Sequence, residues 1–118
     1  MTLKECYEMM HGDYEGVTGR LVSESLVRKF VLKFLNDPSF GELCSAVESS
    51  DGETAFRASH TLKGICLNLG FTDLYKASSA LTEKLRGNNV LDEESKTLFE
   101  HVREEYDRTI RAIKGLDQ

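Results

Sequence analysis

The sequence predicts an all-α fold: an antiparallel four-helix bundle with short helical additions at the N-terminus. Apolar residues recur at intervals of three and four along most of the chain, and no segment shows the sustained two-residue alternation of a strand. A single proline and nine glycines leave long stretches free to be helical. Short connections make successive helices antiparallel, and a bundle then buries their apolar faces.

Length and composition favour one domain. The 118 residues suit a single domain with one core. We divide this domain into an N-terminal extension, residues 1–22, and a bundle over about residues 23–114. No apolar run approaches the roughly 20 residues of a membrane span, and the first residues lack the apolar core of a signal peptide, so we expect a cytoplasmic protein. The net charge of −5 argues against binding nucleic acid. We expect a monomer.

Local capping signals set the expected helix boundaries in the first half of the chain. Thr2 begins a capping box, and Ser23 is placed to cap the second helix. Between these helices we expect a glycine-containing connection over residues 14–20. Asp37 is expected to cap the third helix, with Pro38 in its first turn. The predicted helices span residues 3–10, 24–35, 38–48, 53–69, 73–86 and 93–114.

The second half carries similar signals. Residues 50–53 read SDGE, a second capping box, and Gly70 is expected to end the helix that follows. Thr72 is expected to cap the fifth helix, which Gly87 stops, and Asp92 the last one.

The helix over residues 53–69 is the most informative. On a helical wheel its core stripe spans an arc of about 100°. His60 lies about 170° from the centre of that arc, so it must point away from the core that this helix buries. The residues of the stripe are Ala55, Ala58, Leu62, Ile65, Cys66 and Leu69.

The neighbours of His60 are unusual for a solvated face. Phe56, Lys63, Gly64 and Leu67 all lie about one turn away, where Glu, Lys and Gln are typical. Glycine costs roughly 1 kcal/mol of helix stability relative to alanine, so Gly64 should bring another advantage, namely open access to the imidazole. The ammonium of Lys63 could screen a phosphoryl group on the ring. A neutral imidazole is a competent phosphoryl acceptor.

This pattern resembles the signature of histidine-containing phosphotransfer (HPt) domains. Residues 58–64 read ASHTLKG and residues 68–70 read NLG, which fits the family pattern of His-x-Leu-Lys-Gly and a further glycine about ten residues after the histidine. The resemblance extends over roughly residues 23–114. Small residues often follow the family's first glycine, whereas this chain has Ile65 and Cys66, both on the inward side of the wheel.

The resemblance implies a phosphocarrier rather than an enzyme. His60 would accept a phosphoryl group, through Nε2, from the aspartate of a receiver domain or from a histidine kinase, and pass it to a response regulator. Lys63 would stabilise the phosphoryl group and Gly64 would keep the site open. No cofactor is expected on this chain, because the receiver supplies the acidic pocket and the Mg²⁺. The expected partners are response-regulator receiver domains and a hybrid sensor histidine kinase.

Around the histidine we expect a docking surface that comprises Phe56, Arg57, Leu67 and Asn68. Asn68 lies at the edge of the reactive face. Phe56 and Leu67 could instead be secondary core, covered by the N-terminal helix, and Gly64 could instead permit close packing of another helix.

Two other functions compete with the phosphocarrier. The first is a helical docking module that binds receivers or kinases without carrying phosphate. The second is a hydrolytic enzyme, for which the sequence lacks a convincing set of nucleophile, base and acid. Cys6, Cys44 and Cys66 have no metal or redox spacing and are expected to be ordinary thiols. His11 and His101 form no metal-ligand spacing with His60, so no metal site is expected.

Overall fold

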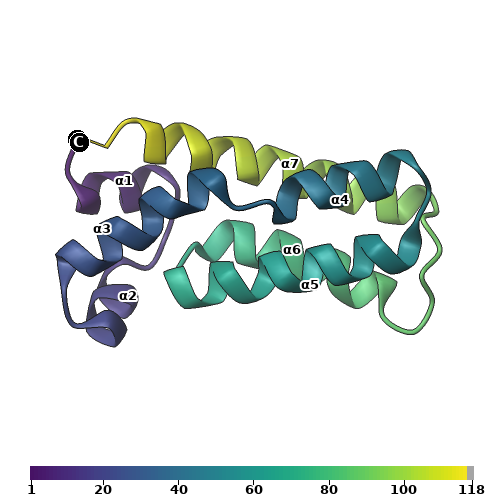
Figure 1. Cartoon of the computed structure of the whole chain (residues 1–118), viewed down its shortest axis with the longest axis horizontal. Helices are drawn as coiled ribbons and strands as arrows, with labels where there is room; N and C mark the ends of the chain where they lie inside the picture. Colours follow the sequence, from purple (N-terminus) through teal and green to yellow (C-terminus); the bar gives the residue numbers. More distant parts are fainter. Residues whose placement is uncertain (117–118) are drawn as a thin grey trace.

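A computed structural model describes residues 1–116 and confirms the all-α prediction. Within these residues there are α-helices and one 3₁₀ turn, and no strand. None of these helices is long and apolar enough to cross a membrane. The elements, shown in Figure 1, are α1 (Leu3–Met9), α2 (Tyr14–Leu21), α3 (Glu24–Lys33), η1 (Phe34–Asn36), α4 (Ser39–Glu48), α5 (Gly52–Leu69), α6 (Thr72–Leu85) and α7 (Glu93–Lys114).

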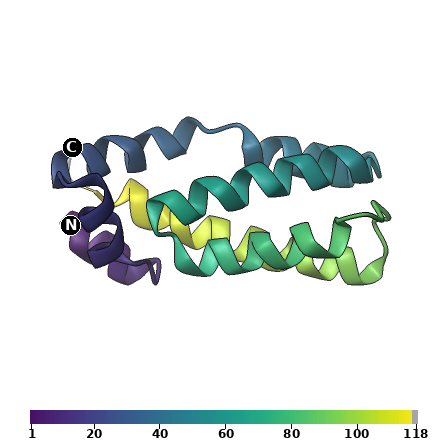
Figure 2. The same ribbon diagram turned by 90° about the horizontal axis from the view of Figure 1, so that it is seen from below.

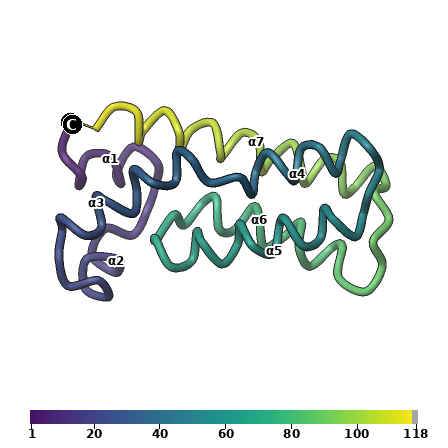
Figure 3. The backbone as a smooth tube through the Cα atoms, viewed as in Figure 1, coloured from purple at the N-terminus to yellow at the C-terminus, as the bar shows by residue number. Residues whose placement is uncertain are grey.

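Helices α4 to α7 form the four-helix bundle, each antiparallel to the next (Figures 1 and 3). The bundle closes where the ring of Phe40, on α4, stacks on that of Tyr106, on α7, with centroids 4.0 Å apart. The molecule is elongated, with extents of 40 × 23 × 19 Å. Large side chains that fill its interior include Leu43, Leu62, Leu74, Leu81, Leu85, Phe99, Val102 and Ile113.

The N-terminal helices gather at one end of the bundle. Helix α3 and turn η1 lie nearly in line with α4, and α1 packs against the C-terminal part of α7 (Figure 1). The two ends of the chain lie together at this end (Figure 2). The amino group of Met1 donates a hydrogen bond to the carbonyl of Gly115 at 3.2 Å.

Several predicted helix ends are confirmed. Thr2 and Glu5 form the reciprocal capping box that begins α1. The carboxylate of Asp92 accepts a hydrogen bond from the amide of Ser95 and begins α7. Gly70 ends α5 in the left-handed conformation, with φ at 71°.

The predicted connection over residues 14–20 is wrong, because this segment is helix α2. Asp13 caps it by accepting a hydrogen bond from the amide of Gly16, and the carboxylate folds so closely over Gly16 that a Cβ there would collide with it. Val17 is fully buried. The glycine that suggested a loop thus lies beneath the capping carboxylate in the first turn, and burial of Val17 stabilises the helix.

The boundaries between residues 33 and 39 also differ from the prediction. Helix α3 ends at Lys33, and the chain tightens into the 3₁₀ turn η1, rather than continuing as one helix to residue 35. Helix α4 begins at Ser39, so Pro38 precedes it instead of lying within its first turn. Pro38, and not Asp37 as predicted, therefore occupies the capping position, although the carboxylate of Asp37 accepts a hydrogen bond from the amide of Ser39 at 2.9 Å.

Two other predicted caps are also shifted by one residue. Asp51, not Ser50, caps α5, and its carboxylate accepts from the amide of Thr54. Helix α6 begins at Thr72 with Phe71 at the capping position, and no side chain in the described part of the chain caps that end with a hydrogen bond. Phe71 is buried, so apolar packing fixes the start of α6 where capping was expected.

Candidate functional site

Helix α5 carries the candidate phosphoacceptor on its outer face. The predicted stripe is buried, apart from Ile65, which is half-buried at the edge of the bundle. His60 is exposed, as the helical wheel predicts. Among residues 1–116 its imidazole has no hydrogen-bond partner, so the edge of the ring that bears Nε2 is available to an incoming group.

Phe56 lies one turn before His60, with ring centroids 6.0 Å apart. Its side chain is half-buried against the core, and the guanidinium of Arg86, on α6, lies over the ring with Cζ 5.3 Å from the centroid. Phe56 therefore belongs partly to the core and partly to the surface. The N-terminal helix does not cover it, because α1 packs against α7. Arg86 was not among the predicted site residues.

Lys63 reaches across to α6 rather than toward the imidazole. Its Nζ lies 3.6 Å from Oε2 of Glu83, and its side chain is only 23% exposed. Arg86 holds the same carboxylate, with Nη2 2.9 Å from Oε2. The hydrogen bond from Arg86 lowers the pKa of Glu83, and the charge of Lys63 adds to this effect. Glu83 is thus a fixed negative charge between two cations.

Gly64 is open to solvent. Within the described residues 1–116, a Cβ at this position would meet no atom of another segment within 4 Å, so none of the described helices packs against it. The alternative that Gly64 permits close helix packing is therefore wrong. Leu67, one turn further along, is 55% exposed and is not secondary core. Together His60, Gly64 and Leu67 form an open strip along α5.

A buried pair of hydroxyl groups joins α5 to α6 directly behind this strip. Thr82 Oγ1 donates a hydrogen bond to Ser59 Oγ at 3.0 Å, and Ser59 Oγ donates in turn to the carbonyl of Phe56 on its own helix. Both side chains are fully buried. Because Ser59 immediately precedes His60, this contact fixes the register of α5 against α6, and with it the distance from His60 to the charged groups of α6.

The C-terminal end of α5 is capped by the N-terminal segment. Tyr7 is fully buried and donates a hydrogen bond to the carbonyl of Leu69 at 2.6 Å. Arg20 donates to the carbonyls of Leu67 and Asn68, at 3.3 and 3.1 Å. The last turn of a helix leaves its carbonyls without partners inside the helix, and side-chain donors supply them here. No such capping role was predicted for residues 1–22.

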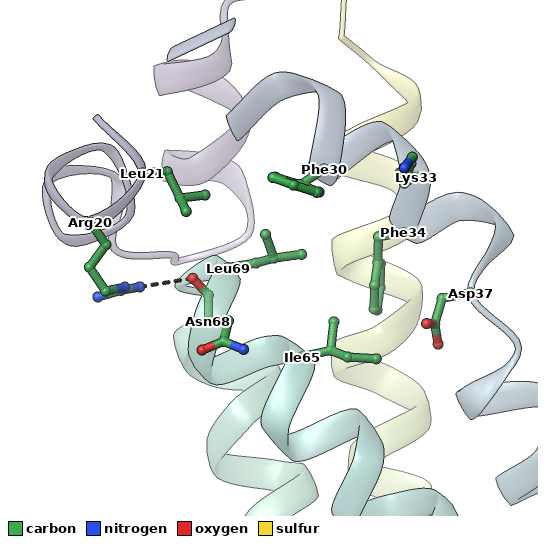
Figure 4. A pocket seen from close by; sticks show the side chains of 9 residues that line it. All are labelled: Arg20, Leu21, Phe30, Lys33, Phe34, Asp37, Ile65, Asn68 and Leu69. Atoms are coloured by element: carbon green, nitrogen blue, oxygen red, sulfur yellow. Dashed lines mark hydrogen bonds between the residues drawn. The ribbon is translucent and has the colours of Figure 1, made fainter. Parts of the chain in front are cut away.

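Beside this end lies a groove of about 430 Å³, shown in Figure 4. Its walls are mainly apolar, and charged groups of Arg20, Lys33 and Asp37 stand around it. The remaining lining residues are Leu21, Phe30, Phe34, Ile65, Asn68 and Leu69. Asn68 therefore lies between the groove and the strip that begins at His60.

Arg57 and the other two histidines have charged partners of their own within residues 1–116. Arg57 is exposed and donates to Glu53, one turn earlier on α5, at 2.6 Å. His11 is paired with Asp73 at 2.9 Å, and His101 lies 3.8 Å from Glu105. Within residues 1–116 no three His, Cys, Asp or Glu side chains are grouped as a metal site.

The cysteines are free thiols, as expected. Cys6 and Cys66 are fully buried, and Cys44 is partly exposed. Burial raises the pKa of Cys6 to about 11 and raises that of Cys66 further. A thiol with a raised pKa is a poor nucleophile at neutral pH, so these two side chains are suited to packing.

The sequence was compared with models of known protein families, and one family matches. Residues 36–112, which include α4 to α6 and most of α7, match the family model of the Hpt domain. Searches of curated proteins and of solved structures gave no match. The family match contains His60 and Glu83, and it leaves out the residues of α1 and α2 that cap α5.

Proposed function

Because this chain belongs to the Hpt domain family, we propose that it is a histidine phosphotransfer protein of a two-component phosphorelay and that His60 is its phosphoacceptor. The observation that supports the proposal best is the open strip on α5, where the exposed imidazole has no hydrogen-bond partner among residues 1–116 and lies one turn from the exposed Gly64. The phosphoryl donor is the aspartate of a receiver domain or a hybrid sensor histidine kinase. The acceptor is the receiver domain of a response regulator.

The chemistry requires little of this chain. The lone pair on Nε2 of a neutral imidazole attacks the phosphorus of the receiver's aspartyl phosphate. An N–P bond forms, the P–O bond to the aspartate breaks, and the receiver's carboxylate leaves with the bonding electrons. The proton on Nδ1 stays in place, so the ring becomes cationic. The same step in reverse loads the next receiver.

The partner supplies the rest of the machinery in this proposal. The receiver holds the Mg²⁺ and the acidic pocket, so the carrier needs no cofactor of its own. Phe56, Arg57, Leu67 and Asn68 make the docking surface, with apolar area from two of them and polar groups from the others. The carrier acts in the cytoplasm as a monomer, so that its exposed face meets each receiver in turn.

Lys63 stabilises the phosphorylated state. It lies three residues after His60 on the same side of α5, within reach of a phosphoryl group on the ring. A phosphoryl group carries up to two negative charges, and a nearby ammonium makes a charge-assisted hydrogen bond to its oxygens. Gly64 leaves room for the receiver's backbone to approach.

The test is transfer from a radiolabelled, phosphorylated receiver domain of the same cell to the purified chain. We expect an acid-labile, base-stable label on the wild type and none on His60→Gln. His101→Gln, which removes an exposed histidine on α7, is the matched control and should be labelled like the wild type. If His60→Gln takes up label as the wild type does, the carrier proposal is wrong.

The alternative function, a docking module without phosphotransfer, uses the same surface. It predicts that wild type and His60→Gln inhibit the receiver equally and that neither becomes labelled. The two functions therefore differ in whether the wild type becomes labelled and in whether His60→Gln changes inhibition of the receiver.

A further inference from the structure

The ammonium of Lys63 is already paired before any phosphoryl group arrives. Its partner is Glu83 on α6, at 3.6 Å, and the lysine side chain is more buried than the glutamate, 23% against 53% exposed. The lysine stem thus lies along the junction of α5 and α6, with its charge aimed at α6. The carboxylate of Glu83 therefore competes with a phosphoryl group on His60 for this ammonium.

Glu83 is itself held in place. Arg86 donates from Nε to Oε1 at 3.1 Å and from Nη2 to Oε2 at 2.9 Å, which is a two-point contact on the carboxylate. The guanidinium also lies over the ring of Phe56, on α5. The carboxylate is therefore oriented by two helices, and Oε2 is shared between Arg86 and Lys63.

We propose that Glu83 is a positioning residue that holds Lys63 while His60 is unphosphorylated and releases it to the phosphoryl group after transfer. The inference rests on the proposed function of His60. A phosphoryl group with up to two negative charges attracts the ammonium more strongly than a single carboxylate does. Glu83 is not left unpaired by the exchange, because Arg86 keeps both of its contacts.

This exchange has a consequence for the transfer equilibrium. Each phosphorylation of His60 gives up the pair between Lys63 and Glu83, so Glu83 opposes the phosphorylated state. A carrier has to transfer its phosphoryl group to the next receiver, and Glu83 limits the stability of phosphorylated His60 so that this transfer can occur. Glu83→Gln removes the competing charge, and the equilibrium should shift toward phosphorylated His60 by about two- to fivefold, the range that an exposed ion pair can supply.

The experiment measures the equilibrium constant for transfer between a phosphorylated receiver and the full chain. It compares wild type, Glu83→Gln, Lys63→Gln and the double variant. The matched control is Glu100→Gln on α7, because Glu100 is also exposed and also pairs with an arginine three residues later. The control changes the net charge equally and should leave the constant unchanged.

Two results together would support the inference: a shift toward phosphorylated His60 in Glu83→Gln, and no further shift when the same change is made in Lys63→Gln. An unchanged constant in Glu83→Gln would overturn it while the carrier function stands. A shift that persists without Lys63 would also overturn it, because Glu83 would then act on the phosphoryl group directly. If the wild type takes up no label at all, the proposed function fails first.

Discussion

Replacing Gly64 with alanine separates stability from function. Gly64 lies in the interior of α5, and an added methyl group would meet no other segment within 4 Å. Glycine is 0.8–1.0 kcal/mol less favourable than alanine inside a helix. With an unfolding entropy of about 2.1 cal/mol/K per residue over 118 residues, a gain of 1 kcal/mol raises Tm by about 4 °C.

Phosphotransfer should change in the opposite direction. The methyl group would lie one turn from His60, on the strip that a receiver must approach. Extra atoms in a close-packed contact typically cost about 1–3 kcal/mol, so we expect transfer from a phosphorylated receiver to slow by about five- to 150-fold. The measurements are thermal unfolding by circular dichroism and single-turnover transfer of a radiolabelled phosphoryl group.

Gly41→Ala on α4 is the matched control, because that position is also exposed, helical and open around its Cα. It should stabilise the protein without slowing transfer. If Gly64→Ala raises Tm and transfers phosphate at the wild-type rate, the glycine is not there for access. If Gly64→Ala lowers Tm, the added methyl group does not have the room around Gly64 that the structure shows.

Three further outcomes are expected. Tyr7→Phe leaves the buried carbonyl of Leu69 without its donor and should lower the free energy of unfolding by about 1–3 kcal/mol in urea titrations, whereas an unchanged midpoint would contradict the cap. Hydrogen bonds from the amide of Ser95 and then from Lys84 lower the pKa of Asp92. The wild type should therefore have a higher free energy of unfolding than Asp92→Asn above about pH 5, and this difference should disappear as the pH falls through the lowered pKa. A difference that grows in acid would contradict the lowered pKa. Native protein should expose one thiol, Cys44, to a thiol reagent, and rapid labelling of all three cysteines would contradict the buried positions of the other two.

Much of the fold could be predicted because its signals are local. The capping box at Thr2, the cap at Asp92 and the left-handed Gly70 each depend on a few neighbouring residues. Helix α2 could not be predicted in this way. Its glycines weaken the helix signal, and its stability comes from burying Val17 against distant parts of the chain.

The candidate site shows the same difference between local signals and long-range packing. His60, Lys63 and Gly64 share one helix, so their relative placement follows from 3.6 residues per turn. Glu83 and Arg86 come from the next helix, and only the packing of α5 against α6 brings them to Lys63. A helical wheel for one helix contains no information about this register, which the buried contact between Ser59 and Thr82 helps to set.

The capping of α5 argues that the N-terminal helices belong with the bundle. The family match begins at residue 36, yet the carbonyls at the end of α5 receive their hydrogen bonds from Tyr7, Arg20 and the amide of Asp13. Gly12 allows this close approach, because a Cβ there would lie 2.8 Å from the carbonyl of Gly70. A helix end buried without partners would be unfavourable, so the first 22 residues contribute to the rigidity of the helix that carries His60.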